Sequence, residues 1–340
     1  MFLRNQWYVA AWSHEVSREL FSRRIAGEPI VFWRTRTGQA VAFEDFCPHR
    51  FAPLSKGKLI ADTVQCSYHG VTFDSTGKCI RVPGQEKVPS GCNVRAYRLE
   101  ERWGWIWLWL GAAENADTSL IPDFHWQSKE GWAPTGGLLH FKGHYQLLVD
   151  NLLDLSHETF LHQKSIGNDS VAEAPAQATT EGNRVRVKRM MRDVPAPPLF
   201  VKARGFKSHI DRLQDITFEP PCYVNIHVRA TPVGSNDDSE ALEWHVLNAL
   251  TPETESSTHY FWGLPRNFSV GDREMDKMLE AAATTTFQED QDMIEAQQLM
   301  LAHRALDSSR LAIRADAGVG RARNIIARLA TAERGEADAR

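Results

Sequence analysis

The first third of the chain alternates short apolar runs with turn residues. The runs are WYVAAW (7–12), EPIVFWRT (28–35), QAVAFEDF (39–46), TVQCSYHGVTFD (63–74) and WGWIWLWL (103–110). Runs of this length that are rich in Val, Ile, Phe and Trp predict β-strands. Thr37-Gly38 and Pro83-Gly84 lie between runs and allow the backbone to turn tightly. We therefore predict an all-β domain over residues 1–112.

The remainder of the chain mixes helical and strand periods. Residues 145–162 and 275–301 have apolar positions at helical spacing, which predicts an amphipathic helix in each. Between them, apolar runs of strand type cover residues 183–191, 222–231, 240–251 and 257–265. The polar stretch 111–124 separates this part from the first. We predict an α+β domain over residues 113–340.

Composition and charge limit the possible partners. The chain has 340 residues, 42% hydrophobic residues and a formal net charge of −4, so it can form a core but has no excess of positive charge. Nucleic-acid and anionic membrane binding are therefore not expected. No export leader and no long apolar run are visible, which predicts a cytoplasmic protein. In that compartment the five cysteines are expected to be reduced thiols or metal ligands.

Two short segments pair a cysteine with a histidine. Cys47 is followed by His49, and after sixteen intervening residues comes Cys66, which is followed by His69. Two cysteines on one iron and two histidines on the other make a Rieske-type [2Fe–2S] cluster. A structural Cys₂His₂ zinc site and two unrelated Cys/His pairs are the alternatives. Zinc sites usually group like ligands, whereas each segment here is mixed, which favours the cluster.

A second candidate metal site lies in the predicted helix 145–162. His157 and His162 are five residues apart, so a bulge or a helix end is needed before both can face the same point. Two imidazoles and one carboxylate form the facial triad of non-haem Fe(II) oxygenases, which leaves positions open for O₂ and substrate. We also predict catalytic roles for Asn151 and Asp154. Asp154 lies three residues before His157, within reach of an imidazole N–H on a regular helix.

The carboxylate of this triad must come from elsewhere in the chain. The helix predicted at 275–301 offers Glu289, Asp290 and Asp292. Asp290 is three residues from Phe287 and four from Ile294, so it lies on the helix face that carries apolar residues. We therefore predict Asp290 as the third ligand, although an acid on a helix is usually only part of a solvated face.

With both motifs identified, the chain resembles Rieske non-haem iron oxygenases, in particular the oxygenase components of vanillate O-demethylase and their relatives such as dicamba monooxygenase. The resemblance covers nearly the whole length. It includes NQWYVAAW, the cluster segments CPHR and CSYHG, VDNLLDLSHETFLH, TPETESSTHYFWGLPRNF and QEDQDMIEAQQ. It implies an N-terminal Rieske domain, a C-terminal helix-grip catalytic domain with an antiparallel sheet, and Asp290 as the third iron ligand.

The resemblance also implies an activity and partners. The expected reaction is O₂-dependent O-demethylation of a methoxylated aromatic acid, which gives a phenol and formaldehyde. Electrons would come from a separate NAD(P)H-dependent flavin and [2Fe–2S] reductase. The subunits would form a homotrimer in which Asp154 lies between His69 of one subunit and His157 of the next. Hydroxylation of a methyl or ring carbon of an aromatic acid or aryl sulfonate is the nearest alternative. A Rieske electron-transfer protein without oxygenase activity is an alternative of a different class.

The substrate pocket is the part of the sequence with the weakest signal. The polar residues Asn225, His227, Arg229 and Asn248 fall on predicted strands of the second domain, and we take them as pocket candidates. Asn248 and Ala281 fall where dicamba monooxygenase carries a His and a Trp, so dicamba itself is not the expected substrate.

Overall fold

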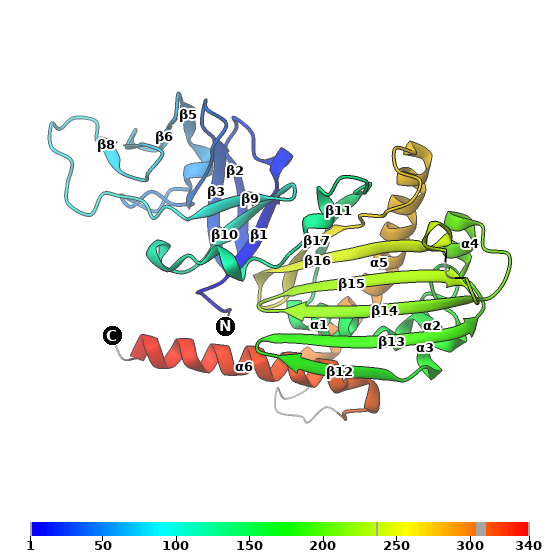
Figure 1. The fold of residues 1–340 in the computed structure, drawn as a ribbon. Helices are drawn as coiled ribbons and strands as arrows, with labels where there is room; N and C mark the ends of the chain where they lie inside the picture. Colours follow the sequence, from blue (N-terminus) through cyan, green and yellow to red (C-terminus); the bar gives the residue numbers. More distant parts are fainter. Residues whose placement is uncertain (1, 236, 304–310, 339–340) are drawn as a thin grey trace. The chain divides into compact units, whose positions relative to one another are not determined.

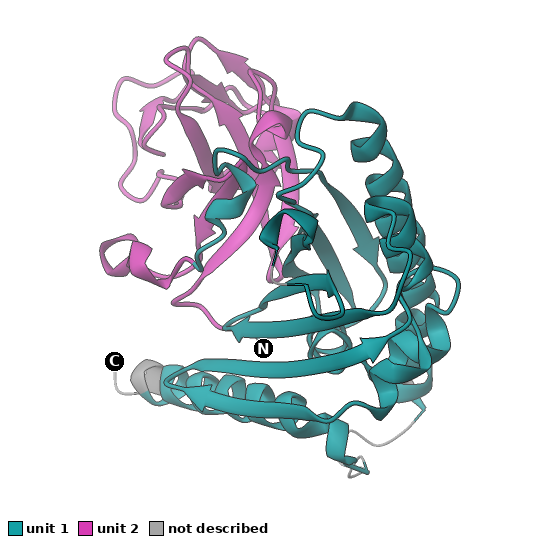
Figure 2. Ribbon diagram, turned by 45° about the vertical axis from the view of Figure 1, so that its right-hand side comes forward, with its two compact units in different colours: residues 1, 122–340 teal, residues 2–121 magenta. Residues whose placement is uncertain are grey.

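The computed structural model describes residues 2–235, 237–303 and 311–338. The chain forms two compact units, one from Phe2 to Ile121 and the other beginning at Pro122 (Figure 2). The division therefore falls nine residues after the predicted domain end at residue 112. Residues 111–121 of the polar stretch belong to the first unit, and residues 122–124 begin the second.

The first unit is built from three small antiparallel sheets (Figure 1). One contains β1 (Trp7–Trp12), β10 (Trp105–Trp109) and β9 (Leu99–Arg102), and a second contains β2 (Phe21–Ile25), β3 (Glu28–Arg34) and β4 (Ala40–Glu44). The third contains β5 (Lys58–Ile60), β6 (Thr63–Gln65), β7 (Thr72–Phe73) and β8 (Cys79–Arg81). Short 3₁₀ turns cover Ser13–Glu15, Leu54–Lys56, Ala113–Asn115 and Thr118–Leu120. The predicted all-β character of this part is confirmed.

Strand β10 alternates tryptophans with Ile106 and Leu108. Trp105, Trp107 and Trp109 are all buried, and the indoles of Trp7 and Trp109 lie 5.5 Å apart. The turn before this strand places Trp103 and Gly104 at φ of 54° and 78°, a backbone that suits a two-residue hairpin connection. The tryptophans therefore form part of the core of the first unit.

The second unit contains one seven-stranded antiparallel sheet (Figure 1). Its order is β11 (Gly136–Phe141), β17 (Ser257–Gly263), β16 (Leu242–Thr254), β15 (Tyr223–Pro232), β14 (Ile210–Glu219), β13 (Arg184–Val194) and β12 (Ala176–Glu181). The helices are α1 (Tyr145–Leu153), α2 (Glu158–Leu161), α3 (Asp169–Glu173), α4 (Pro198–Arg204), α5 (Arg273–Ala302) and α6 (Ala317–Asp338). Short 3₁₀ turns cover His125–Gln127, Leu155–His157, Asp238–Glu240 and Arg314–Asp316.

The sheet has one face toward α1. This helix packs against β14, β15 and β16 and also contacts α5, whereas α6 lies along β12 and β13. Along β15, Val224, Ile226 and Val228 are buried and alternate with Asn225 and His227, which are only partly buried, because successive residues of a strand face opposite sides. The predicted α+β domain with an antiparallel sheet is confirmed. Strands β11, β12 and β14 and helix α6 were not predicted.

Candidate metal centres

The two predicted cluster segments form loops with the same hydrogen-bond pattern. In one, the backbone N–H of Cys47 donates to the carbonyl of Ala52 (2.8 Å) and that of Phe51 donates to the carbonyl of Cys47 (2.8 Å). In the other, the backbone N–H of Cys66 donates to Val71 (2.8 Å) and that of Gly70 donates to Cys66 (2.9 Å). Each loop is therefore closed by its own backbone and presents its ligands without help from distant residues.

Both loops turn through a left-handed residue. Phe51 has φ of 55° and Gly70 has φ of 72°. A Cβ at Gly70 would also lie 2.9 Å from the ring of Pro83, so the second loop needs glycine for both conformation and space. Phe51 is 73% exposed, which lets its side chain point away from the loop.

The candidate ligands divide by burial. Cys47 and Cys66 are buried in the core of the first unit, whereas His49 and His69 are exposed and their rings lie 4.5 Å apart. Among the described residues, the sets of ligand atoms that converge closely enough for a single ion do not include these four. Four ligand atoms that do not converge on one point fit a two-iron cluster better than a single zinc ion, because the cysteines and the histidines then bind different irons.

The five-residue spacing of the second motif is explained by a break in the helix. Helix α1 ends at Leu153, and Asp154 has an extended backbone with φ of −120° and ψ of 95°. A 3₁₀ turn then leads to His157, and His162 follows the end of α2. The carboxylate of Asp154 caps this turn by accepting from the backbone N–H of Ser156 (2.9 Å). A helix end, one of the two options open from the sequence, thus turns both imidazoles toward one point.

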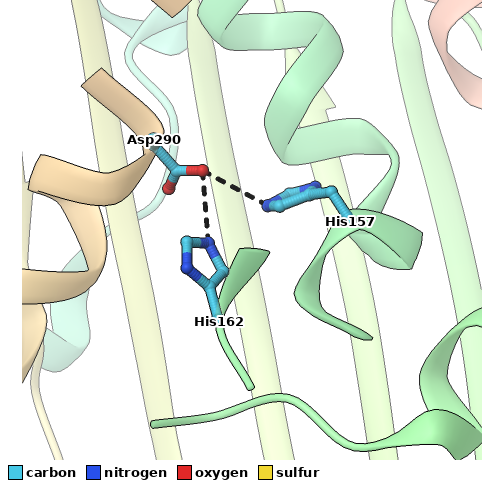
Figure 3. Close-up of side chains that lie close together, drawn as sticks. All are labelled: His157, His162 and Asp290. Carbon is cyan, nitrogen blue, oxygen red and sulfur yellow. Dashed lines mark hydrogen bonds and ion pairs between the residues drawn. The ribbon is translucent and has the colours of Figure 1, made fainter. Parts of the chain in front are cut away.

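Three predicted side chains meet at that point (Figure 3). The Oδ1 atom of Asp290, which comes from α5, lies 3.4 Å from Nε2 of His157 and 3.2 Å from Nε2 of His162. The ligand atoms of the three residues all lie within 4.8 Å of one another. His162 and Asp290 are buried at 1% and 4% exposure. The arrangement offers two nitrogens and one carboxylate to a single ion, which is the donor set of a non-haem Fe(II) centre.

Hydrogen bonds fix which nitrogen each histidine offers. Nδ1–H of His157 donates to the backbone carbonyl of Asp154 (2.8 Å), and Nδ1–H of His162 donates to Oε2 of Glu289 (2.7 Å). Because Nδ1 of each ring is held in this way, Nε2 is the nitrogen that each histidine presents toward Asp290. Glu289 was considered from the sequence as a possible ligand, and the structure places it behind His162.

The position of Asp154 corrects one sequence-based expectation. On a regular helix its carboxylate would approach the ring of His157, but the helix has ended, so the main-chain carbonyl makes this contact. The carboxylate instead accepts hydrogen bonds from the backbone and hydroxyl of Ser156 and lies 4.0 Å from Arg189.

The electrostatics of the triad favour a bound cation. Burial alone would raise the pKa of Asp290, but hydrogen bonds from His157 and His162 outweigh burial and lower that pKa to about 2. Burial lowers the pKa of each histidine, and the nearby Asp290 carboxylate more than reverses this, so that both pKa values are raised. The amide of Asn151 also donates to Oδ1 of Asp290 (3.0 Å), which holds the carboxylate in place.

A buried polar chain anchors the segment between the two histidines to the sheet. The carboxylate of Glu158 accepts from Arg212 (2.8 Å) and from Gln214 (2.9 Å), both on β14. Arg189 on β13 donates in turn to Gln214 (3.1 Å). Arg212, Gln214 and Glu158 are 1%, 0% and 3% exposed, so the ion pair is desolvated, and each carboxylate oxygen of Glu158 accepts a hydrogen bond.

An apolar pocket opens beside the triad. Its walls include the aromatic side chains Phe200, Trp244, Trp262 and Phe287, the aliphatic residues Leu152, Leu155, Ile166, Leu199, Ile226, Val228, Val246, Leu264, Leu279 and Ala283, and the polar residues His157, Glu158, His162, Arg212, Thr286 and Asp290. A flat apolar molecule bound there would lie against the candidate metal site.

The predicted pocket residues lie elsewhere, which corrects the sequence-based expectation. Asn225, His227 and Arg229 alternate with Ile226 and Val228, the residues that line the pocket, and so face the other side of the sheet.

Asn248 also lies outside the pocket lining, although it is fully buried. Its amide donates to the carbonyls of Val224 and Val246, and its carbonyl accepts from the hydroxyl of Tyr260. The residues predicted for the pocket were all polar, whereas most of the residues that line it are apolar.

Within the part of the chain that the structure describes, no helix combines the length and apolar character needed to cross a bilayer.

Comparisons with known proteins agree with this geometry. Residues 6–95 match the Rieske [2Fe–2S] domain, and residues 141–332 match the vanillate O-demethylase oxygenase C-terminal domain. The vanillate O-demethylase oxygenase subunit of Pseudomonas sp. (strain HR199 / DSM 7063) is 38% identical over 100% of this chain and 98% of its own length. The toluene-4-sulfonate monooxygenase system iron–sulfur subunit of Comamonas testosteroni is 33% identical over 98% of this chain and 99% of its own.

Solved structures extend the likeness to the fold. Dicamba monooxygenase bound to 3,6-dichlorosalicylic acid superposes with a TM-score of 0.93 at 32% identity, over 98% of both chains. The same enzyme with non-haem iron and dicamba gives a TM-score of 0.86 at 32% identity, over 98% of this chain and 99% of the other. The chain therefore belongs to the vanillate O-demethylase family of Rieske non-haem iron oxygenases, oxidoreductases that carry a [2Fe–2S] cluster and a mononuclear iron.

Proposed function

We propose that this chain is the terminal oxygenase of a multicomponent system that O-demethylates a methoxylated aromatic acid. The observation that carries the proposal is the convergence of His157, His162 and Asp290 at the wall of an apolar pocket, in a chain that also presents the two cluster loops. A protein that only carries electrons needs the cluster loops and no second metal site beside a pocket.

The candidate ligands follow from this proposal. Cys47 and Cys66 would hold the buried iron of the cluster, and His49 and His69 the exposed one. His157, His162 and Asp290 would hold the mononuclear iron through two Nε2 atoms and one carboxylate. That iron supplies the binding and reduction of O₂, with electrons delivered through the cluster.

The remaining residues of the pocket position the substrate and exclude water. Phe200, Trp244, Trp262 and Phe287 provide ring faces and edges against which an aromatic substrate packs. All four are buried, which keeps bulk water away from the reacting methyl group.

The overall reaction consumes one O₂, two electrons and two protons for each methoxy group. One oxygen atom enters a methyl C–H bond, the resulting hemiacetal loses formaldehyde and leaves a phenol, and the other oxygen becomes water. O-demethylation is the activity printed for the relatives that act on vanillate and on dicamba, which supports it for this chain.

The test is turnover of the purified protein with a matching reductase, NADH and a panel of methoxybenzoates. We expect formaldehyde and the corresponding phenol in equal amounts for at least one acid, and none with the His157→Ala variant. Absence of formaldehyde across the panel, in protein that consumes O₂ with another aromatic acid, would rule out the demethylase activity.

Hydroxylation is a second candidate because a toluene-4-sulfonate monooxygenase subunit is similar over nearly the whole chain. Product mass separates the two reactions. Hydroxylation adds one oxygen and keeps every carbon, whereas demethylation removes one carbon.

We also propose the partners that the family implies. A separate NAD(P)H-dependent flavin and [2Fe–2S] reductase would reduce the cluster, and a homotrimer would bring Asp154 of one subunit between its own His157 and His69 of the next. Exposure of His69 and partial exposure of Asp154 support this arrangement. Light scattering tests the trimer. The Asp154→Asn variant should keep both metals and slow reductase-driven turnover, whereas unchanged turnover would exclude a role of the Asp154 carboxylate in the bridge.

A further inference from the structure

A second group of candidate metal ligands lies on the opposite face of the sheet. His227 on β15 and Glu243 and His245 on β16 bring their ligand atoms within 4.8 Å of one another. His227 and His245 are directly paired across the two strands, and their rings stack at 4.6 Å with an interplanar angle of 12°. The group repeats the donor set of the iron centre, two imidazoles and one carboxylate, from residues that alternate with the pocket wall.

The ring of His245 already makes the kind of Nδ1 hydrogen bond that orients a metal-binding histidine. Nδ1–H of its ring donates to the carbonyl oxygen of Asn225 (3.0 Å), which leaves Nε2 with its lone pair. The indole of Trp126 stacks on the same ring at 3.8 Å, so the imidazole lies between Trp126 and His227. Burial, together with neighbouring His227, lowers the pKa of His245 to about 3, and the ring is therefore neutral at pH 7.

His227 and Glu243 supply the other two ligand atoms. Nε2 of His227 donates to Oε1 of Glu243 at 2.8 Å, and this hydrogen bond lowers the pKa of the Glu243 carboxyl. The second oxygen of Glu243 accepts from the amide of Asn267 (3.0 Å), which orients the carboxylate. A metal ion that displaces the shared proton would find an imidazole nitrogen and a carboxylate oxygen side by side.

We propose that His227, Glu243 and His245 form a binding site for a divalent transition metal of the zinc class. Imidazole and carboxylate ligands suit Zn²⁺, and three protein ligands leave a position open for solvent. That position faces a hollow of about 490 Å³, which Asp123, Trp126, Asn225 and other residues line together with both histidines. The site goes beyond the proposed oxygenase function and does not depend on it.

Occupation of this site would link the two strands beneath the substrate pocket. Ile226 and Val228 on β15 and Trp244 and Val246 on β16 line the pocket from the other face. A metal bound by His227 and His245 would therefore hold the strands in register where the pocket wall is formed. Binding to the folded chain alone also raises its stability in proportion to the logarithm of the metal concentration.

The experiment is a zinc titration of the holoprotein with its cluster and mononuclear iron in place. Calorimetry should show one Zn²⁺ bound per chain, metal analysis should show that all iron is retained, and the thermal midpoint should rise with zinc. His245→Ala and Glu243→Gln should lose the calorimetric signal and the thermal shift. Glu243→Gln is included because Glu243 is partly exposed and its replacement leaves the stacked rings of Trp126, His245 and His227 in place.

The matched control is His140→Ala. His140 also pairs with a glutamate on a neighbouring part of the sheet, Glu253, but it is not part of a converging set among the described residues. This variant should bind zinc as the parent does.

Asn225→Leu should weaken zinc binding by about 10–100-fold, because His245 loses the acceptor for its Nδ1–H, and Asn225→Asp should restore the affinity. Zinc uptake only in exchange for iron, or equal uptake by the parent and both ligand variants, would overturn the proposal.

Discussion

The cluster loops and the iron triad use similar ligands but depend on different parts of the fold. Each cluster loop brings a cysteine and a histidine together within a few residues and closes on its own backbone hydrogen bonds. The triad joins a broken helix to Asp290 on α5, more than a hundred residues later, and His162 and Asp290 are buried. The cluster should therefore tolerate damage in the second unit, whereas the triad should respond to any change that moves α5 or the sheet.

The largest effect that separates the two sites is expected from Asp290→Ala. Removing the buried carboxylate leaves two histidines, so mononuclear iron and turnover should fall to background while the cluster keeps its electron paramagnetic resonance signal. Asp292→Ala is the matched control because Asp292 is an exposed acid on the same helix, and its variant should retain iron. Loss of the cluster signal in Asp290→Ala would show that the two sites are not independent.

The converse change is Cys66→Ser. The cluster should be lost and reductase-driven turnover with it, since electrons no longer reach the iron, but the mononuclear iron should still bind. Metal and acid-labile sulfide analysis measures both. Cys92→Ser controls for the loss of a thiol, because Cys92 lines a hollow beside His49 and His69 without belonging to either loop. Retention of sulfide in Cys66→Ser would contradict the ligand assignment.

Loss of the ion pair between Glu158 and Arg212, which anchors the triad to the sheet, should have a smaller effect, but still a large one. Arg212→Met leaves the carboxylate of Glu158 buried without its charged partner, which typically costs about 3–5 kcal/mol. The free energy of unfolding of the second unit, followed in urea, should fall by that amount. The double variant Glu158→Gln with Arg212→Met should recover most of the loss. If the double variant is no more stable than the single one, the ion pair is not the source of the effect.

The smallest effect is expected from Glu289→Ala. His162 loses the acceptor for its Nδ1–H, and the affinity of the site for Fe²⁺ should fall by about 10–100-fold. Competition with a chelator measures this affinity, and the cluster content should not change. Equal affinity in the variant and the parent would mean that the broken helix alone orients His162.

The sequence predicted two short segments that each carry a cysteine and a histidine, and this pattern is readable because each loop closes on its own backbone hydrogen bonds. It also predicted that histidines five residues apart need either a bulge or a helix end, but not which of the two occurs. The choice of Asp290 over Glu289 depended on a helix face and on family resemblance. The roles of Glu289 behind His162 and of the carbonyl of Asp154 could not be predicted, since both depend on how the broken helix packs.

The pocket and the strand beneath the triad were harder to predict for a physical reason. Strand β14 turns Arg212 and Gln214 inward to meet Glu158, so its sequence lacks the usual apolar alternation and the strand was missed. On β15 the alternation is regular, but polar residues such as His227 were taken as pocket candidates although the pocket uses the apolar side. Polarity at one position does not reveal which face of a sheet carries the substrate.

The anchoring of Glu158 to β14 also limits how the pocket of this chain can be reshaped for other substrates. Because Glu158 is the residue next to His157, a new side chain at Arg212 or Gln214 would disturb the iron at the same time as it reshaped the cavity. Replacements at Leu279, Ala283 or Ile226 alter the walls without touching that anchor. Laboratory evolution toward new aromatic acids should therefore accumulate mutations on α5 and β15 and leave β14 unchanged.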